Sequence, residues 1–261
     1  MNTDNGLHWP NLGEPYNQAL REAVAFILDR FEVWGIIASG SILDGRADPG
    51  SDLDIYVVHA KPLRQRVQRW FNGVPCEIFV NPPAAIRRYF EGERDRPSTA
   101  AMLATGKVVL DRHPVVAELR AEAQRRLETP PNLSAAELTM RRYGAADVYE
   151  NAQDIAVRDP ANASLILHEA VRAMLNYAFL SANHPLPRVK TMLPALAELD
   201  PTLGALARAY YEAADAPARF VLAAQIAERT IQATGFFEWE STPDSFPDST
   251  IPDSPVEEAN A

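Results

Sequence analysis

The spacing of apolar and polar residues changes near residue 112 of this 261-residue chain. Before that point, an amphipathic pattern over residues 16–31 predicts a helix that packs on a sheet. A nearly uninterrupted apolar run over residues 33–39 predicts a strand buried on both faces. Asn72-Gly73, a dipeptide typical of a tight hairpin turn, predicts that two of the later strands pair directly. These later strands are expected at residues 53–58, 66–71, 74–80 and 106–110.

After residue 112 the apolar spacing is helical throughout. Short polar links between the segments predict an antiparallel bundle. The predicted fold is therefore α+β: residues 1–112 form a domain with a mixed, mostly antiparallel sheet flanked by helices, and residues 113–237 form a helical bundle domain. The helices of this bundle are expected at residues 115–127, 134–157, 164–182, 187–199, 201–213 and 217–233.

Residues 238–261 differ in composition from both of these parts. They repeat Pro-Asp-Ser three times, contain seven acidic residues and no Lys or Arg, and have too few apolar residues to fold. We expect a disordered acidic tail. It carries most of the formal charge of −10, since the remaining chain has 28 acidic against 25 basic residues. A nearly neutral body lacks the basic stripe that nucleic acids require, so we do not expect a nucleic-acid substrate.

Three features of the sequence indicate the compartment. No apolar run approaches the ~20 residues that span a bilayer, and the N-terminal residues do not form a basic and then apolar secretory signal. The single cysteine, Cys76, excludes an internal disulfide and a multi-cysteine zinc site. We therefore expect a cytoplasmic protein without membrane contact, in which Cys76 is a core residue.

The residues with the clearest chemistry lie between residues 40 and 58. Asp52 and Asp54 are two positions apart at the start of a predicted strand, so both side chains leave the same face and can bind a hard divalent cation. Gly40-Ser41 ends the preceding strand, where free backbone N–H groups and a hydroxyl can hold phosphate oxygens. Taken singly, Gly-Ser is a common turn and Asp-x-Asp often lies on a solvated surface. The two carboxylates alternate here with apolar residues, and such crowding favours a metal site.

This segment resembles the signature of the DNA-polymerase-beta-like nucleotidyltransferase superfamily: Gly-Ser, a spacer of about ten residues, and Asp-x-Asp between apolar residues. Residues 36–58 match this pattern tightly. Over most of residues 15–236, the chain is similar to the aminoglycoside nucleotidyltransferases of the kanamycin and streptomycin type, which join such a catalytic domain to a C-terminal helical domain. The resemblance implies that residues 1–112 are the catalytic domain.

The resemblance also implies a third carboxylate on a neighbouring central strand, and Glu77 is the candidate. Glu77 lies among apolar residues, where an unpaired carboxylate is costly. The alternative is a glutamate on an edge strand that faces solvent. As a functional residue, Glu77 is either the third metal ligand or the general base toward the acceptor hydroxyl, and the sequence does not separate these roles.

The implied reaction depends on metal ions. Asp52, Asp54 and Glu77 would hold two Mg²⁺ ions, and ATP or another NTP would be the co-substrate. The acceptor hydroxyl would attack the α-phosphorus in line, with AMP from ATP as the first choice of transferred group. An aminoglycoside-like acceptor is implied by the resemblance alone.

For nucleotide binding the resemblance implies four residues: Gly40, Ser41, Ser51 and Lys190. The hydroxyl of Ser51 is explained equally well as the cap of a turn that enters a strand. Lys190 is also explained as a solvated surface lysine. Arg46 in the spacer either approaches phosphate or pairs with Asp44 or Asp48.

Glu150 and Glu169 are further general-base candidates, since some aminoglycoside enzymes take this base from the helical domain. Most helix glutamates simply face solvent. Helical bundles of this kind can dimerise, and the sequence is compatible with a homodimer. Two other functions compete with a small-molecule nucleotidyltransferase: an antitoxin-type enzyme that modifies a protein, and a non-catalytic nucleotide-binding or interaction module. The intact Gly-Ser and Asp-x-Asp elements favour a catalyst over the module.

Overall fold

The computed structural model describes residues 6–241 and residue 243. Within them, five strands form one sheet in the order β3-β4-β2-β1-β5. β2 and β4 are parallel, and the other neighbours are antiparallel. The prediction of a mixed, mostly antiparallel sheet is confirmed. The strands are β1 (Val33–Ser39), β2 (Leu53–His59), β3 (Gln65–Phe71), β4 (Val74–Asn81) and β5 (Lys107–Asp111).

The central strands are buried on both faces because their side chains are apolar in both directions. In β1 and β2, all but one residue of each strand is buried. The hairpin of β3 and β4 turns at Asn72 and Gly73, which have φ angles of 44° and 74° as a primed turn requires. β3 is therefore an edge strand, and it places β4 beside β2.

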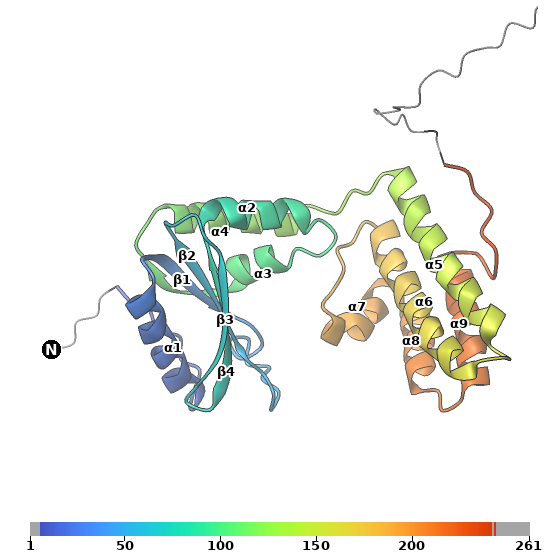
Figure 1. Cartoon of the computed structure of the whole chain (residues 1–261), viewed down its shortest axis with the longest axis horizontal. Coiled ribbons are helices and arrows are strands. Elements are labelled where there is room, and N and C mark those ends of the chain that lie inside the picture. The colour runs from blue at the N-terminus through green and yellow to red at the C-terminus, as the bar shows by residue number, and fades with distance from the viewer. Residues whose placement is uncertain (1–5, 242, 244–261) are drawn as a thin grey trace, which may run out of the picture.

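Helices cover both faces of this sheet (Figure 1). α1 (Tyr16–Arg30) packs on one face with residues such as Leu20 and Ile27. The other face is covered by α2 (Pro83–Gly92), α3 (Ser98–Thr105) and α4 (Val115–Glu128). Successive side chains of β2 point to opposite faces of the sheet. Ile55 and Val57 face α1, and Tyr56 and Val58 face the three other helices.

α4 packs on the sheet, whereas the sequence analysis expected this helix in the bundle after residue 112. Val116 and Leu119 of α4 pack in the same core as Ile37 and Tyr56 of the sheet. The amphipathic pattern identifies a helix, but it does not say which core the apolar face enters. We therefore propose that any division into two domains lies after Glu128, in the segment 129–134.

The C-terminal part is helical, as predicted, and has its own core. Buried residues of this core include Tyr149, Met174 and Tyr210. α5 begins at a capping box, in which Ser134 and Glu137 each bond the other's backbone N–H. The helices are α5 (Ala135–Ile155), α6 (Pro160–Ser181), α7 (Met192–Leu199), α8 (Pro201–Glu212) and α9 (Ala216–Thr230), with a 3-10 turn, η1 (Val189–Thr191), before α7.

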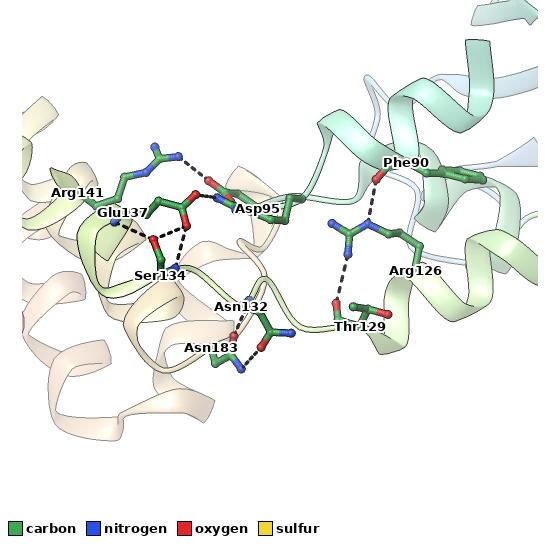
Figure 2. Close-up of polar contacts among 10 residues, drawn as sticks. Phe90, Asp95, Arg126, Thr129, Asn132, Ser134, Glu137, Arg141 and Asn183 are labelled. Atoms are coloured by element: carbon green, nitrogen blue, oxygen red, sulfur yellow. Dashed lines mark hydrogen bonds and ion pairs between the residues drawn. The ribbon is translucent and has the colours of Figure 1, made fainter. Parts of the chain in front are cut away.

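The chain enters the helical part through a short link that is anchored at its start. The guanidinium of Arg126, near the end of α4, donates to the carbonyl of Phe90 at 2.9 Å and to the carbonyl of Thr129 at 3.4 Å (Figure 2). These bonds tie the end of α4 to α2. They also set the direction in which residues 129–134 leave the sheet.

Polar contacts also connect the two parts across this junction (Figure 2). Asp95, between α2 and α3, accepts from Arg141 of α5 at 2.7 Å. The backbone carbonyl of Asp95 accepts from the N–H of Leu186, at 2.8 Å, in the segment that leads to α7. Asn132 and Asn183 bond each other twice, at 2.9 and 3.0 Å. The segment that precedes α7 is thus held beside the sheet.

Most of the predicted acidic tail lies outside the described residues. Of residues 238–261, the structure describes 238–241 and 243, and they form neither helix nor strand. Among residues 6–241 and 243, every helix is too short or too polar to span a bilayer.

The contact between α7 and α8 depends on a glycine. A Cβ at Gly204 would lie 2.6 Å from the Cα of Ala197, which is backbone and cannot move aside cheaply. We predict that Gly204→Ala lowers the free energy of unfolding by about 1–3 kcal/mol. Gly144→Ala, in α5 with no atom within 4 Å of the added Cβ, is the matched control, and we expect it to be stabilising. Melting temperatures of both variants test this, and a stabilising Gly204→Ala would contradict the packing.

Candidate functional site

The pairing of β2 with β4 brings three carboxylates together. Asp54 and Glu77 are register partners in the parallel pair. Asp52 precedes Asp54 by two residues and lies on the same side of the sheet. One ligand oxygen from each of the three residues lies within 4.8 Å of the others. Sequence reasoning had linked Asp52 to Asp54 by alternation, and the sheet topology adds Glu77 to this cluster.

The cluster is electrostatically costly without a cation. Burial, followed by repulsion from Asp52 and Glu77, raises the pKa of the Asp54 carboxyl to about 6, and Arg188 and Arg66 oppose this shift. A divalent cation would remove the repulsion, and carboxylate oxygens are ligands that hard cations prefer. The donor set therefore fits a hard divalent cation.

Glu77 is also held by two side chains of β3. Arg66 forms an ion pair with Glu77, and the Nε2 of Gln68 donates to its Oε1 at 2.9 Å. Arg66 also donates to Oε1, and among the described residues no side chain bonds Oε2, which leaves that oxygen for a metal ion. β4 has neighbours on both sides, and the Glu77 side chain is only 12% exposed. Glu77 is therefore not the solvent-facing residue of an edge strand.

The turn after β1 approaches the carboxylates closely. Gly40 has a φ angle of +101°, and a Cβ at this position would lie 2.9 Å from Oδ2 of Asp54. The hydroxyl of Ser41 contacts that of Ser51 at 2.9 Å. Ser51 is buried and accepts from the backbone N–H of Asp48 at 2.8 Å. The hydrogen bonds of Ser51 thus hold together the loop between β1 and β2, which agrees with its alternative role as the cap of a turn. A contact of Ser51 with phosphate stays a prediction.

A cavity of about 800 Å³ opens over these groups. Ser41, Asp52 and Asp54 line it from the sheet side. Arg188, Lys190 and Thr191 line it from the segment that leads to α7, and Thr105 lines it from the end of α3. The cavity is thus lined both by carboxylates of the sheet and by the cations Arg188 and Lys190, an arrangement suited to a metal-bound triphosphate.

Sequence reasoning missed Arg188 and Arg66. Arg188 lies two positions before Lys190. Two cations this close to the start of a predicted helix could have indicated that both residues bind phosphate. The sequence left two roles for Arg46, contact with phosphate or pairing with Asp44 or Asp48. In the structure Arg46 pairs with Asp44 at 2.8 Å and lines the same cavity.

The structure does not bring the two helical-region glutamates to this cavity. Glu150 is half-buried on α5, Glu169 is exposed on α6, and neither is among the described residues that line it.

Comparison with known proteins identifies the class of domain that contains this site. Residues 20–96 match the family model of the nucleotidyltransferase domain, a stretch that contains Gly40, Ser41 and all three carboxylates. One similar solved structure is that of a nucleotidyltransferase-like protein from Exiguobacterium sibiricum 255-15. It is 15% identical, with a TM-score of 0.50 over 82% of this chain and 74% of that chain, which supports the fold alone. No curated protein matches the chain.

The raised pKa of Asp54 predicts that this residue destabilises the metal-free protein. The folded-state pKa of about 6 lies above the ordinary value of 3.8, so the folded protein binds this proton more tightly. The free energy of unfolding therefore falls as the pH rises from about 4 to about 6. At pH 7.5, Asp54→Asn should raise the free energy of unfolding by on the order of 2 kcal/mol. Near pH 4 this gain should disappear, because Asp54 is then protonated in the folded wild type.

Denaturant unfolding at both pH values, with the exposed Asp154→Asn as control, measures this effect. Magnesium should stabilise the wild type more than Asp54→Asn. A destabilised Asp54→Asn at pH 7.5 would contradict the account of the cluster.

The approach of Gly40 to Asp54 predicts a separate effect on the metal. Gly40→Ala should weaken Mg²⁺ binding roughly tenfold, because the new methyl group displaces the Asp54 carboxylate. Gly45→Ala is a matched control, since Gly45 also has a positive φ, +69°, and no atom lies within 4 Å of its added Cβ. Both variants should lose about 1 kcal/mol of stability from backbone strain. Calorimetric Mg²⁺ titration separates them, and equal affinities would overturn the prediction.

Proposed function

We propose that this protein is a metal-dependent nucleotidyltransferase that transfers a nucleoside monophosphate, AMP from ATP as the first choice, to a hydroxyl group of a small molecule. The observation that carries the proposal is the convergence of Asp52, Asp54 and Glu77 beside a cavity whose lining also includes Arg188 and Lys190. The match of residues 20–96 to the nucleotidyltransferase domain supports the same reaction class.

The residues of the chain have separate tasks in this reaction. Asp52, Asp54 and Glu77 would hold Mg²⁺, which when bound would neutralise the triphosphate and polarise the α-phosphorus. Ser41 and Lys190 would hold the β- and γ-phosphates.

The acceptor oxygen would then form a bond to the α-phosphorus while the bond to the bridging oxygen breaks and pyrophosphate leaves. Oε2 of Glu77, the oxygen not engaged by Arg66, is our candidate for receiving the hydroxyl proton. Arg188 would stabilise the negative charge that develops on the departing pyrophosphate.

We do not extend the proposal to an aminoglycoside acceptor. Aminoglycosides carry several positive charges, and the body of this protein is nearly neutral. Arg66 beside Glu77 adds a cation where such an acceptor would have to approach. The class of acceptor is taken up below.

ATP titrations with and without Mg²⁺ test the first half of the proposal. We expect Mg²⁺-dependent ATP binding by the wild type and its loss in the Asp52→Asn/Asp54→Asn double variant. Lys190→Gln should weaken binding roughly tenfold, about 1.4 kcal/mol. Lys61→Gln, which removes an exposed lysine from the loop between β2 and β3, is the matched control and should bind normally.

The second half is tested with ATP labelled on the α-phosphate and a protein-free extract of small metabolites. Label should move to a small molecule as pyrophosphate appears. Label that appears only on added proteins would favour the protein-modifying alternative. ATP binding without pyrophosphate release would favour the non-catalytic module.

A further inference from the structure

A second cavity, of about 460 Å³, opens on the same face of the sheet as the three carboxylates. Tyr56, Phe79 and Asn81 line it from the strands. Tyr89 and Glu93, from α2 and the residues that follow it, line it from the other side. Its volume is within the range of small-molecule binding sites in proteins.

This cavity lies beside the carboxylates, two residues farther along β2 and β4. Tyr56 follows Asp54 by two residues on β2, and Phe79 follows Glu77 by two residues on β4. Asp54 pairs with Glu77, and Tyr56 pairs with Phe79, so the two pairs lie side by side on one face. Two residues of a strand span roughly 7 Å, which is within the length of a small molecule.

Aromatic rings form part of the cavity wall. The rings of Tyr56 and Phe79 stack with centroids 5.8 Å apart. The hydroxyl of Tyr56 accepts a bond from Asn81 at 3.1 Å, which fixes the ring. Tyr89 adds a third ring from α2. Such rigid walls favour a planar ligand.

Among the described residues, the charged groups of the cavity lining are two arginines and one glutamate. Arg64 and Arg66 both line it. Arg64 donates to the hydroxyl of Tyr89 at 2.8 Å and forms no ion pair with any residue that the structure describes. Glu93 is the one acidic residue among the described residues of the lining. Both of its oxygens are occupied, by the N–H of Thr99 at 2.6 Å and by the Thr99 hydroxyl at 2.8 Å.

We propose that this cavity is the acceptor site and that it takes a planar, anionic, hydroxylated molecule, such as a hydroxylated aromatic carboxylate, and not a polycation. This inference rests on the proposed function. The carboxylate of the acceptor would pair with Arg64, and its ring would lie among Tyr56, Phe79 and Tyr89. Its hydroxyl would point toward Glu77.

The reaction balances with these groups alone. The acceptor oxygen bonds to the α-phosphorus, the bond between that phosphorus and the bridging oxygen breaks, and pyrophosphate leaves. The hydroxyl proton passes to Glu77 and then to water.

Arg66 connects this site to the carboxylates, because it lines the cavity and pairs with Glu77. An anionic acceptor that attracts Arg66 would weaken this pair and release Glu77. A polycationic acceptor would instead meet Arg64, which forms no ion pair among the described residues, as a like charge. The same side chains that favour an anion therefore select against a polycation.

Ligand-observed NMR on the full-length protein tests the proposal. The probes are 4-hydroxybenzoate and 6-hydroxy-2-naphthoate, each compared with its uncharged carboxamide, together with kanamycin as the polycation. We expect each carboxylate to bind at least tenfold more tightly than its amide. Arg64→Gln should abolish this preference. Arg88→Gln, the same change at an exposed residue of α2 that does not line the cavity, should retain it.

Mg²⁺-ATP titration of the same samples separates the two proposals. Normal ATP binding by Arg64→Gln would show that the variant is folded and that its loss is local to the cavity. If Mg²⁺-ATP binds but neither carboxylate does, or if an amide or kanamycin binds equally well, the acceptor assignment is overturned and the nucleotidyltransferase proposal stands. Loss of Mg²⁺-ATP binding by the wild type would overturn both.

Discussion

Repulsion among three carboxylates is the constraint on which the rest of the site depends. Asp52, Asp54 and Glu77 are held with ligand oxygens within 4.8 Å of one another. Burial, followed by repulsion from Asp52 and Glu77, raises the pKa of the Asp54 carboxyl to about 6. The pairing of Arg66 with Glu77 offsets part of this repulsion, whereas Asp52 and Asp54 form no ion pair with any residue that the structure describes. The protein tolerates the repulsion because a buried sheet, with helices on both faces, holds β2 and β4 in register. The carboxylates lower the free energy of unfolding of the metal-free protein at the position where a cation would bind, as is common at functional sites.

Two cavities adjoin the carboxylates: Asp52 and Asp54 line one, and Tyr56 and Phe79, two residues after Asp54 and Glu77, line the other. One cavity includes the turn after β1 and the cations Arg188 and Lys190. The other is lined by aromatic rings and Arg64. The first suits a triphosphate and the second suits an acceptor, so an in-line transfer between them would occur at the cluster. The helical part contributes through the segment before α7, in which the N–H of Leu186 donates to the backbone carbonyl of Asp95.

Much of the fold and part of the site could be predicted from the sequence. The strands and most helices follow from local periodicity, and Asp52 and Asp54 are linked by alternation within one strand. Glu77 was reached through the resemblance, because its approach to Asp54 depends on a non-local event: β4 inserts between β3 and β2. The core that α4 enters was not predictable, since an amphipathic helix carries no information on its partner. Arg64, Arg66 and Arg188 were missed because long side chains on loops and edge strands leave no periodic signal, and tertiary packing decides where they point.

A crystal structure with Mn²⁺ and an ATP analogue that cannot be cleaved between the α- and β-phosphates tests the central claim most directly. The account predicts anomalous density for Mn²⁺ among Asp52, Asp54 and Glu77. It also predicts the triphosphate beside Ser41 and Lys190, with the cavity of Tyr56 and Phe79 left free for the acceptor. Mn²⁺ bound elsewhere, or a triphosphate in the aromatic cavity, would contradict it.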